Sequence, residues 1–223
     1  MMVLQCLAAV LVASRTYWYV ALPLLIVAIV FVLGVAAVMP SRVATLLRGI
    51  PSVLVIGFFA NQFAGHFASN WLLATSGIAG SATVVSIEST SSMYNDQPVM
   101  RHQVMIRPQQ GGAVIQTYFD TSDFNITPQP TEGGYVYPQQ GSRFNVRYLP
   151  DFPRAVVVLS DDDSPYSRSL RCQHSMEVQN KLSNQLAFDP QNGEFKAALA
   201  NAKHVAEQDC RDPDVPATET PIP

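Results

Sequence analysis

The chain has 223 residues, of which 48% are hydrophobic and 14% are charged, and its net charge is −3. Soluble domains carry about 25% charged residues, so this shortfall of charged residues is typical of a partly membranous protein. Lys and Arg form no cluster in the polar part, so we expect no nucleic-acid partner. The first acidic residue is Glu88, and every carboxylate therefore lies in the second part of the chain.

Residues 1–16 form an apolar N-terminal segment whose apolar stretch, about 13 residues, is short for a membrane span. It lacks the basic start of a signal peptide, so we expect it to be retained. Three placements stay open: in the membrane interface, as an extension of the first long helix, or as a short extra crossing. Arg15 and the aromatic residues Tyr17, Trp18 and Tyr19 suit the lipid headgroup region.

Residues 17–76 are predicted to form a transmembrane helical hairpin. One apolar run extends from Tyr17 to Met39 and a second begins at Ile50 and extends to Ala68. Each is near the roughly 20 helical residues that cross a bilayer's hydrocarbon core. The lipid bilayer is therefore the first expected partner.

Pro40 is expected to end the first helix, and a short connection carrying Arg42 and Arg48 then leads to Ile50. Because cytoplasmic loops are enriched in Lys and Arg, this connection is predicted to be cytoplasmic. The second span returns the chain, which places the polar part on the outer side of the membrane.

Small residues recur at helical spacing in the second span: Gly57, Ala60, Ala64 and Ala68. Such spacing lets two helix backbones approach closely in lipid. Two interpretations stay open, namely packing against the first span and packing against a helix of another protein or of a second copy.

Gln62 and His66 begin a polar stripe that continues at Ser69 or Asn70. Polar groups in lipid need partners and face protein or water. Hydrogen bonding between helices or an interfacial position explains the stripe, and proton or ion conduction is the alternative. Neither span contains a carboxylate to relay a charge.

Residues 81–160 alternate apolar and polar side chains between turn residues, which predicts a small antiparallel β-domain, either a barrel or a curled sheet. The expected strands cover residues 81–89, 98–108, 113–121, 135–137, 141–150 and 154–160.

The end of this region, GSRFNVRYLPDFPRAVVVL, resembles the small β-domain of an uncharacterised bacterial membrane-protein family, a domain of unknown function that follows N-terminal transmembrane helices. The resemblance covers roughly residues 81–160 and the preceding helix. It implies an extracytoplasmic β-domain on a bacterial inner-membrane protein, and no activity or cofactor. The residues that carry it are Gly141, Val146, Tyr148, Pro150, Pro153 and residues 156–159.

Residues 172–210 are predicted to form an amphipathic helical hairpin, with Val178, Leu182 and Leu186 on one face of its first helix. Cys172 and Cys210 flank the hairpin, and antiparallel helices would bring them together in a disulfide, which demands an oxidising compartment. Two unpaired thiols are the alternative, and a zinc site lacks further ligands at close spacing. Residues 211–223 are expected to be a disordered tail.

No nucleotide-binding, zinc-protease or serine-hydrolase motif occurs in the chain. The acidic run at residues 161–163 lacks the spacing of a calcium loop and is expected to be solvated. His102, His174 and His204 are expected to have structural or surface roles. We therefore predict no catalytic residue, metal or cofactor.

Together these features predict an α+β membrane protein of the bacterial inner membrane that crosses it more than once and carries a periplasmic domain. Its expected function is non-enzymatic interaction with other membrane or envelope proteins, or with itself, as an accessory subunit of an envelope complex or as a toxin-immunity protein. The alternative is a transporter or channel component that uses Gln62 and His66.

Overall fold

A computed structural model describes residues 2–128 and 134–211. The expected tail beyond Arg211 lies outside these residues. Within them, the helices are α1 (Met2–Thr16), α2 (Trp18–Val38), α3 (Ser41–Ser76), the 3-10 helix η1 (Thr121–Asp123), α4 (Pro165–Phe188) and α5 (Gly193–Asp209). The strands are β1 (Ile78–Tyr94), β2 (Gln97–Pro108), β3 (Ile115–Asp120), β4 (Ile126–Thr127), β5 (Arg143–Leu149) and β6 (Phe152–Leu159).

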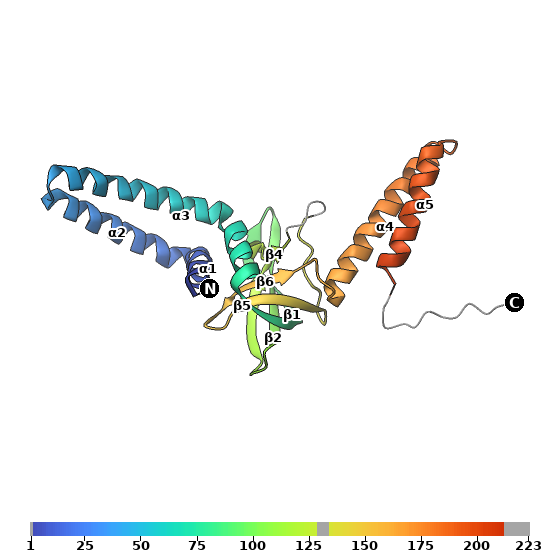
Figure 1. The fold of residues 1–223 in the computed structure, drawn as a ribbon, viewed down its shortest axis with the longest axis horizontal. Coiled ribbons are helices and arrows are strands. Elements are labelled where there is room, and N and C mark those ends of the chain that lie inside the picture. Colours follow the sequence, from blue (N-terminus) through green and yellow to red (C-terminus); the bar gives the residue numbers. More distant parts are fainter. Residues whose placement is uncertain (1, 129–133, 212–223) are drawn as a thin grey trace.

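The molecule consists of three parts in a row (Figure 1): the α2–α3 hairpin at one end, the sheet in the middle, and the α4–α5 hairpin at the other end. The predicted α+β class is therefore confirmed. Helix α1 lies between the first hairpin and the sheet, and the two hairpins point away from the sheet in different directions.

Helices α2 and α3 are long and apolar enough to cross a membrane. The 21 residues of α2 extend over roughly 32 Å and the 36 residues of α3 over roughly 54 Å, at 1.5 Å per residue. Large apolar side chains such as Phe31 and Ile56 are exposed along both helices. Exposed apolar surface of this extent suits lipid rather than water.

The expected loop between Pro40 and Ile50 is wrong. Helix α3 begins at Ser41, directly after Pro40, and both Arg42 and Arg48 lie within it with exposed side chains. Pro40 ends α2 because the residue before a proline avoids helical backbone, and Met39 is extended. Arginine is a good helix former, so the two charged residues do not interrupt the helix.

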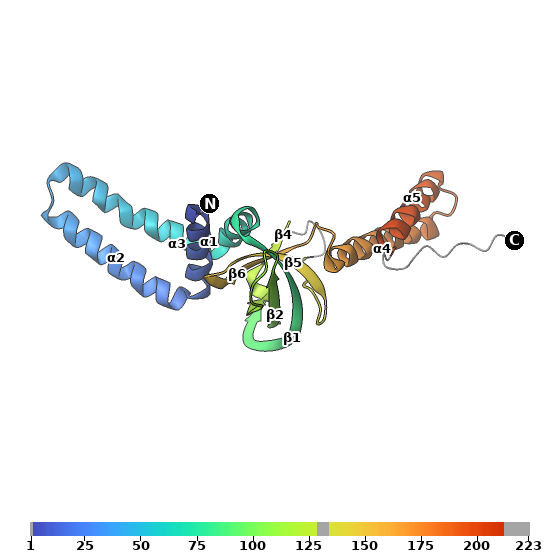
Figure 2. The same cartoon turned by 60° about the horizontal axis from the view of Figure 1, so that its bottom comes forward.

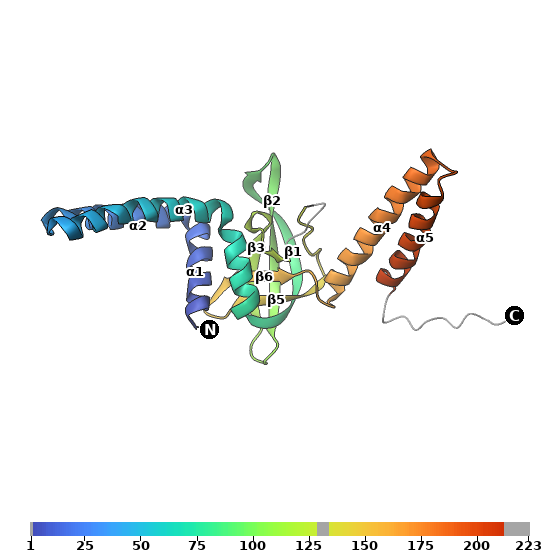
Figure 3. The same ribbon diagram turned by 45° about the horizontal axis from the view of Figure 1, so that its top comes forward.

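Helix α1 is a separate element that crosses the base of the hairpin (Figure 3). It packs on the last turns of α3 and on β6 through a small apolar core. This packing and the break at Tyr17 exclude α1 as a straight extension of α2. The core comprises Ala8, Leu72, Leu73, Leu149, Ala155 and Val157, with Leu11, Val12 and Phe152 at its edge.

The six strands form one open sheet in the order β3-β2-β1-β5-β6-β4. Every pairing is antiparallel except that of β4 with β6. Strand β1 is paired on both sides, and register shifts after Val84 and Ser89 let it bend. One face carries the main core, in which Ile106, Phe119 and Tyr148 are fully buried.

The alternative of a closed barrel is wrong. In the part of the chain that the structure describes, no ladder joins β3 to β6. Instead, the Arg154 guanidinium donates a hydrogen bond to the carbonyl oxygen of Tyr118 at 2.8 Å, and the Thr117 hydroxyl donates to the carbonyl oxygen of Pro153 at 3.1 Å. Side chains thus hold the two strands near each other without backbone pairing.

Residues 135–137, expected as a strand, pair with no strand in the described residues. Their side chains fill the core instead: the Tyr137 ring packs on His102 and Phe119, and its hydroxyl donates a hydrogen bond to the carbonyl oxygen of Thr121. The short strand β4 takes the edge position beside β6.

The α4–α5 hairpin stands away from the sheet and joins it at the start of α4 (Figure 2). Helix α4 begins at Pro165, earlier than expected, with Ser164 as its N-cap. Tyr166 is buried against the sheet, and its hydroxyl donates to the carbonyl oxygen of Val136 at 2.6 Å. The sulfurs of Cys172 and Cys210 are at disulfide distance and link α4 to the end of α5.

We expect the disulfide to hold the hairpin closed. The two cysteines are 38 residues apart, and cross-linking a loop of this length stabilises by roughly 3–4 kcal/mol. Replacing both Cys172 and Cys210 by Ser should lower the amide-exchange protection of α5 by a corresponding amount and leave the sheet protected, as measured by hydrogen-exchange mass spectrometry. The control is Cys6→Ser, which removes an exposed free thiol. Unchanged protection of α5 in the double variant would contradict the expectation.

Candidate functional site

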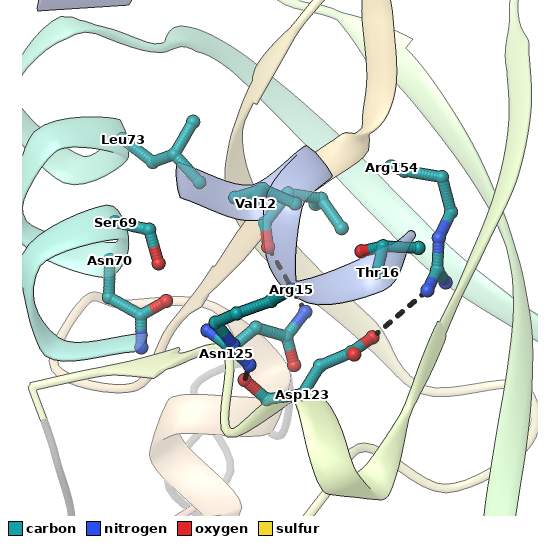
Figure 4. A pocket seen from close by; sticks show the side chains of 10 residues that line it. Val12, Arg15, Thr16, Ser69, Asn70, Leu73, Asp123, Asn125 and Arg154 are labelled. Carbon is teal, nitrogen blue, oxygen red and sulfur yellow. Dashed lines mark hydrogen bonds and ion pairs between the residues drawn. The ribbon is translucent and has the colours of Figure 1, made fainter. Parts of the chain in front are cut away.

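A polar junction joins helices α1 and α3 to the β-domain (Figure 4). Arg15 of α1 donates a hydrogen bond from Nη2 to the carbonyl oxygen of Asp123 at 3.0 Å. Asn70 of α3 donates from Nδ2 to the carbonyl oxygen of Phe124 at 2.7 Å. Two helices thus bind adjacent carbonyl groups of one loop. A void of about 20 Å³, roughly the size of one water molecule, remains between them.

The loop is shaped to present these carbonyl groups. Asp123 accepts a hydrogen bond from the backbone N–H of Asp120 at 2.9 Å, which closes η1. Phe124 then adopts a left-handed backbone with φ of 51°, a conformation uncommon for a residue other than glycine. Asn125 secures the far side, donating from Nδ2 to the carbonyl oxygen of Val156 on β6 at 3.0 Å.

Two cations and one carboxylate meet at the junction. Arg154 Nη2 lies 3.5 Å from Asp123 Oδ2, and Arg15 contacts the backbone of the same aspartate. Burial raises the pKa of Asp123 above its usual range, against the opposing effect of the two arginines. Burial also lowers the pKa of Arg15. The junction therefore holds a positive charge in excess of its carboxylate.

A cleft of about 600 Å³ adjoins the junction, and we call it the junction cleft. Its walls come from α1, α3, the end of β1, the η1 segment after β3 and the extended segment at Tyr135. Ring contacts centred on Phe124 form one wall, with ring centroids of His66, Tyr94 and Tyr135 each between 5.1 and 5.3 Å away. The lining residues are Arg15, Thr16, Gln62, Phe63, His66, Tyr94, Ser122, Asp123, Phe124 and Tyr135.

The predicted polar residues Gln62 and His66 both line the junction cleft. Gln62 donates from Nε2 to the carbonyl oxygen of Ser14 at 3.4 Å, and the neighbouring Asn61 donates to the Ser14 hydroxyl at 2.8 Å. The stripe therefore faces α1 and the loop of the β-domain. This agrees with the expected hydrogen bonding between helices, although the partner is α1 and not the first long span.

The predicted small residues of α3 do not face the junction cleft or another helix. Gly57, Ala60, Ala64 and Ala68 are all exposed on α3, and a side chain at Gly57 would meet no other atom within 4 Å. Packing against α2 is therefore not their role in this structure. Gly65 is instead the buried glycine of α3, beside Asn61 and Arg15.

A second hollow, which we call the hairpin groove, lies between α4 and α5 and has a volume of about 320 Å³. Its lining is mostly apolar and includes three polar residues, His174, Ser175 and Asn201. Val178 and Val205, on opposite helices, remain partly exposed there. The lining residues are His174, Ser175, Val178, Leu182, Ala198, Asn201, Ala202 and Val205.

His102 and Asp162 lie apart from both hollows. His102 is buried against Phe119, and burial lowers its pKa. Asp162 is not a fully solvated residue: the Ser167 hydroxyl donates to it at 2.7 Å. Its partial burial opposes ionisation, but the hydrogen bonds from Ser164 and Ser167 keep the pKa of Asp162 below its usual range. Among the described residues, no group of three or more His, Cys, Asp or Glu side chains could hold a metal ion.

Sequence reasoning did not find the junction. Arg15 was recognisable as an interfacial cation, but Asp123 and Asn125 lie in a loop without a motif, and Arg154 lies in an ordinary strand. Comparisons of the chain with protein-family models, curated proteins and solved structures find no match. The resemblance to a bacterial membrane-protein family therefore stays a prediction.

We expect Asp123 to make stability depend on pH. A carboxyl group whose pKa is raised on folding binds more protons in the folded state, so stability falls as pH rises from about 3.8 through the raised folded pKa. Asp123→Asn removes this titration. The unfolding free energy of Asp123→Asn minus that of the natural chain should therefore increase with pH over this window.

Urea unfolding of the full chain in detergent, followed by circular dichroism at several pH values, measures this difference. The control is Asp163→Asn, which removes a fully exposed carboxylate and should change stability by less than about 0.5 kcal/mol. A difference for Asp123→Asn that stays constant or decreases with pH would exclude a raised pKa.

Proposed function

We propose that this protein is a non-enzymatic, multi-pass protein of the bacterial inner membrane. It holds its β-domain at the periplasmic face of that membrane and binds a helix of an envelope partner in its hairpin groove. The observation that carries the proposal is the groove itself: an apolar hollow on an arm that projects from the domain. The membrane helices provide the anchor, and the junction sets the orientation of the domain.

The groove supports a helical partner because two helices leave an apolar face uncovered. Leu199, Ala202 and Ala206 are buried between α4 and α5, whereas Val178 and Val205 are partly exposed beside them. Apolar residues from both helices thus line one continuous hollow. An amphipathic helix placed there would complete a three-helix bundle, a recurring mode of peptide recognition.

The hairpin also has the rigidity that a docking arm needs. The Cys172–Cys210 pair links α4 to the end of α5, and the Ser175 hydroxyl donates a hydrogen bond to the Asp209 carboxylate nearby. At the other end, Asn192 caps α5 by accepting hydrogen bonds from the N–H groups of Glu194 and Phe195. A groove held at both ends loses little conformational entropy on binding.

The channel alternative gains no support from the positions of Gln62 and His66. Both side chains line a cleft against α1 and the β-domain. A conduction path would instead need polar groups between the two spans at the depth of the hydrocarbon core. The interaction hypothesis is therefore the one that we develop.

Photo-crosslinking in cells tests the hairpin groove. A photoreactive amino acid at Val178 or Val205 should give adducts with a helical segment of an envelope protein. The same probe at Ser183, an exposed residue of α4 outside the groove, is the control. Val178→Asp should weaken partner binding by at least about tenfold, because the carboxylate would be buried without a partner, whereas Ser183→Asp should not.

The identity of the crosslinked peptide distinguishes a structural subunit of an envelope complex from a toxin, the two partner types that we expect. Equal adduct yields at positions 178, 205 and 183, or equal binding by the two aspartate variants, would overturn the role of the groove.

Membrane orientation has its own test. Because Arg42 and Arg48 favour the cytoplasm, alkaline phosphatase fused after Arg48 should be inactive. The same enzyme fused after Arg211 should be active, because it requires the oxidising periplasm to fold. Active fusions after Arg48 together with inactive fusions after Arg211 would reverse the topology, and would also remove the oxidising environment that the Cys172–Cys210 pair needs.

A further inference from the structure

The junction cleft lies at the end of the α2–α3 hairpin, where this hairpin would leave the membrane. Arg15 precedes Trp18, the first residue of α2, by three positions. Gln62 of α3 also lines the cleft and donates a hydrogen bond to the carbonyl oxygen of Ser14 in α1. Trp18 and Tyr19 are exposed and of the type that favours the lipid–water interface. The cleft is therefore beside the headgroups of the surrounding lipid.

Arg15 gives the cleft a cation without a direct counter-charge. Within residues 2–128 and 134–211, no carboxylate oxygen lies within 4 Å of the Arg15 guanidinium. Its Nη2 donates to a backbone carbonyl group, which leaves the other N–H donors of the guanidinium for a ligand. The carboxylate that lines the cleft, Asp123, pairs with Arg154.

Further donors converge on the same space. The Tyr135 hydroxyl is buried and has no hydrogen-bond partner among the described residues. A buried hydroxyl without a partner is costly, so a ligand acceptor at this position would satisfy it. The Ser122 hydroxyl and the His66 ring also line the cleft. Together with Arg15 these groups suit an anion with several oxygen acceptors.

An apolar wall continues from the cleft to the lipid. Phe63 lines the cleft and is 79% exposed on the membrane side of His66. A ligand that fills both regions has an anionic head and an apolar tail. The volume of about 600 Å³ is within the range of small-molecule sites.

We propose that the junction cleft binds the phosphodiester headgroup of an anionic glycerophospholipid, with the phosphate on Arg15 and an acyl chain along Phe63. An uncharged glycerol headgroup fits better than an amine, because the carboxylate of the cleft is already paired with Arg154. The bound lipid would fix the height of the β-domain above the bilayer. This role is independent of the partner helix in the hairpin groove.

Native mass spectrometry of the full chain in detergent tests this proposal. We expect phosphatidylglycerol to be retained at least about tenfold more tightly than phosphatidylcholine, because charge-assisted hydrogen bonds add to binding. Arg15→Gln should remove the preference. Arg48→Gln is the matched control, since it deletes the same charge from an exposed position at the other end of α3.

A second variant covers the case in which Arg15→Gln fails to fold. Ser122→Asp places a carboxylate in the cleft, and the Ser122 side chain makes no hydrogen bond within the described residues. It should lower phosphatidylglycerol binding by about tenfold through like-charge repulsion.

Each contrary outcome overturns the proposal. Equal retention of the two lipids excludes an anion-selective cleft. Equal losses in Arg15→Gln and Arg48→Gln indicate unspecific attraction to charge. Soluble glycerol phosphate, titrated calorimetrically, is the last arm: if it binds as tightly as phosphatidylglycerol, the cleft takes a soluble phosphate ester and not a lipid.

Discussion

The direct connection between α3 and β1 is the constraint on which the rest of the structure depends. One residue, Gly77, separates the end of α3 at Ser76 from the first residue of the central strand, Ile78. A side chain at Gly77 would lie 2.6 Å from the carbonyl oxygen of Leu73 and 3.0 Å from the side chain of Arg147. Glycine is thus what lets the helix end this close to the sheet. With no linker to absorb motion, the helix and the sheet form one unit.

Apolar packing and polar contacts contribute differently to this unit. Leu72, Leu73 and Val157 are almost fully buried where α3 meets β6, and burying such a side chain stabilises by about 1.5–3 kcal/mol. A hydrogen bond such as that from Asn70 to the carbonyl oxygen of Phe124 adds about 0.5–1.5 kcal/mol. Burial therefore supplies most of the stability of the docked state. The directional bonds from Arg15 and Asn70 select one orientation among the many that an apolar surface alone permits.

The predictable parts of this structure are those that a local pattern specifies. The two apolar runs, the alternating strands and the cysteine pair were all recognisable. The length of a membrane span, the alternation of side chains along a strand and the pairing of neighbouring antiparallel helices can each be inferred from residues close together in the sequence. The strand expected at residues 135–137 was wrong because alternation cannot distinguish a paired strand from an extended segment whose rings fill a core, as Tyr137 does. The exposure of Ala60 and Ala64 could not be predicted either, since it depends on where α1 packs. The junction was not predictable at all, because Arg15 and Asp123 are far apart in sequence and each is ordinary in its own segment.

The two hairpins show how the distribution of apolar residues decides what covers them. Helix α2 exposes large apolar side chains such as Leu24, Ile26 and Val27 on several of its sides, and only a surrounding apolar solvent can cover such a surface. The α4–α5 hairpin is mostly polar, and two of its exposed apolar residues, Val178 and Val205, line one groove. The groove that we propose as the site of a partner helix is thus set in a mostly polar hairpin. The same secondary structure, a helical hairpin, thus carries two different surfaces, and the sheet between them, packed against α1 and α3, keeps the second hairpin directed away from the first.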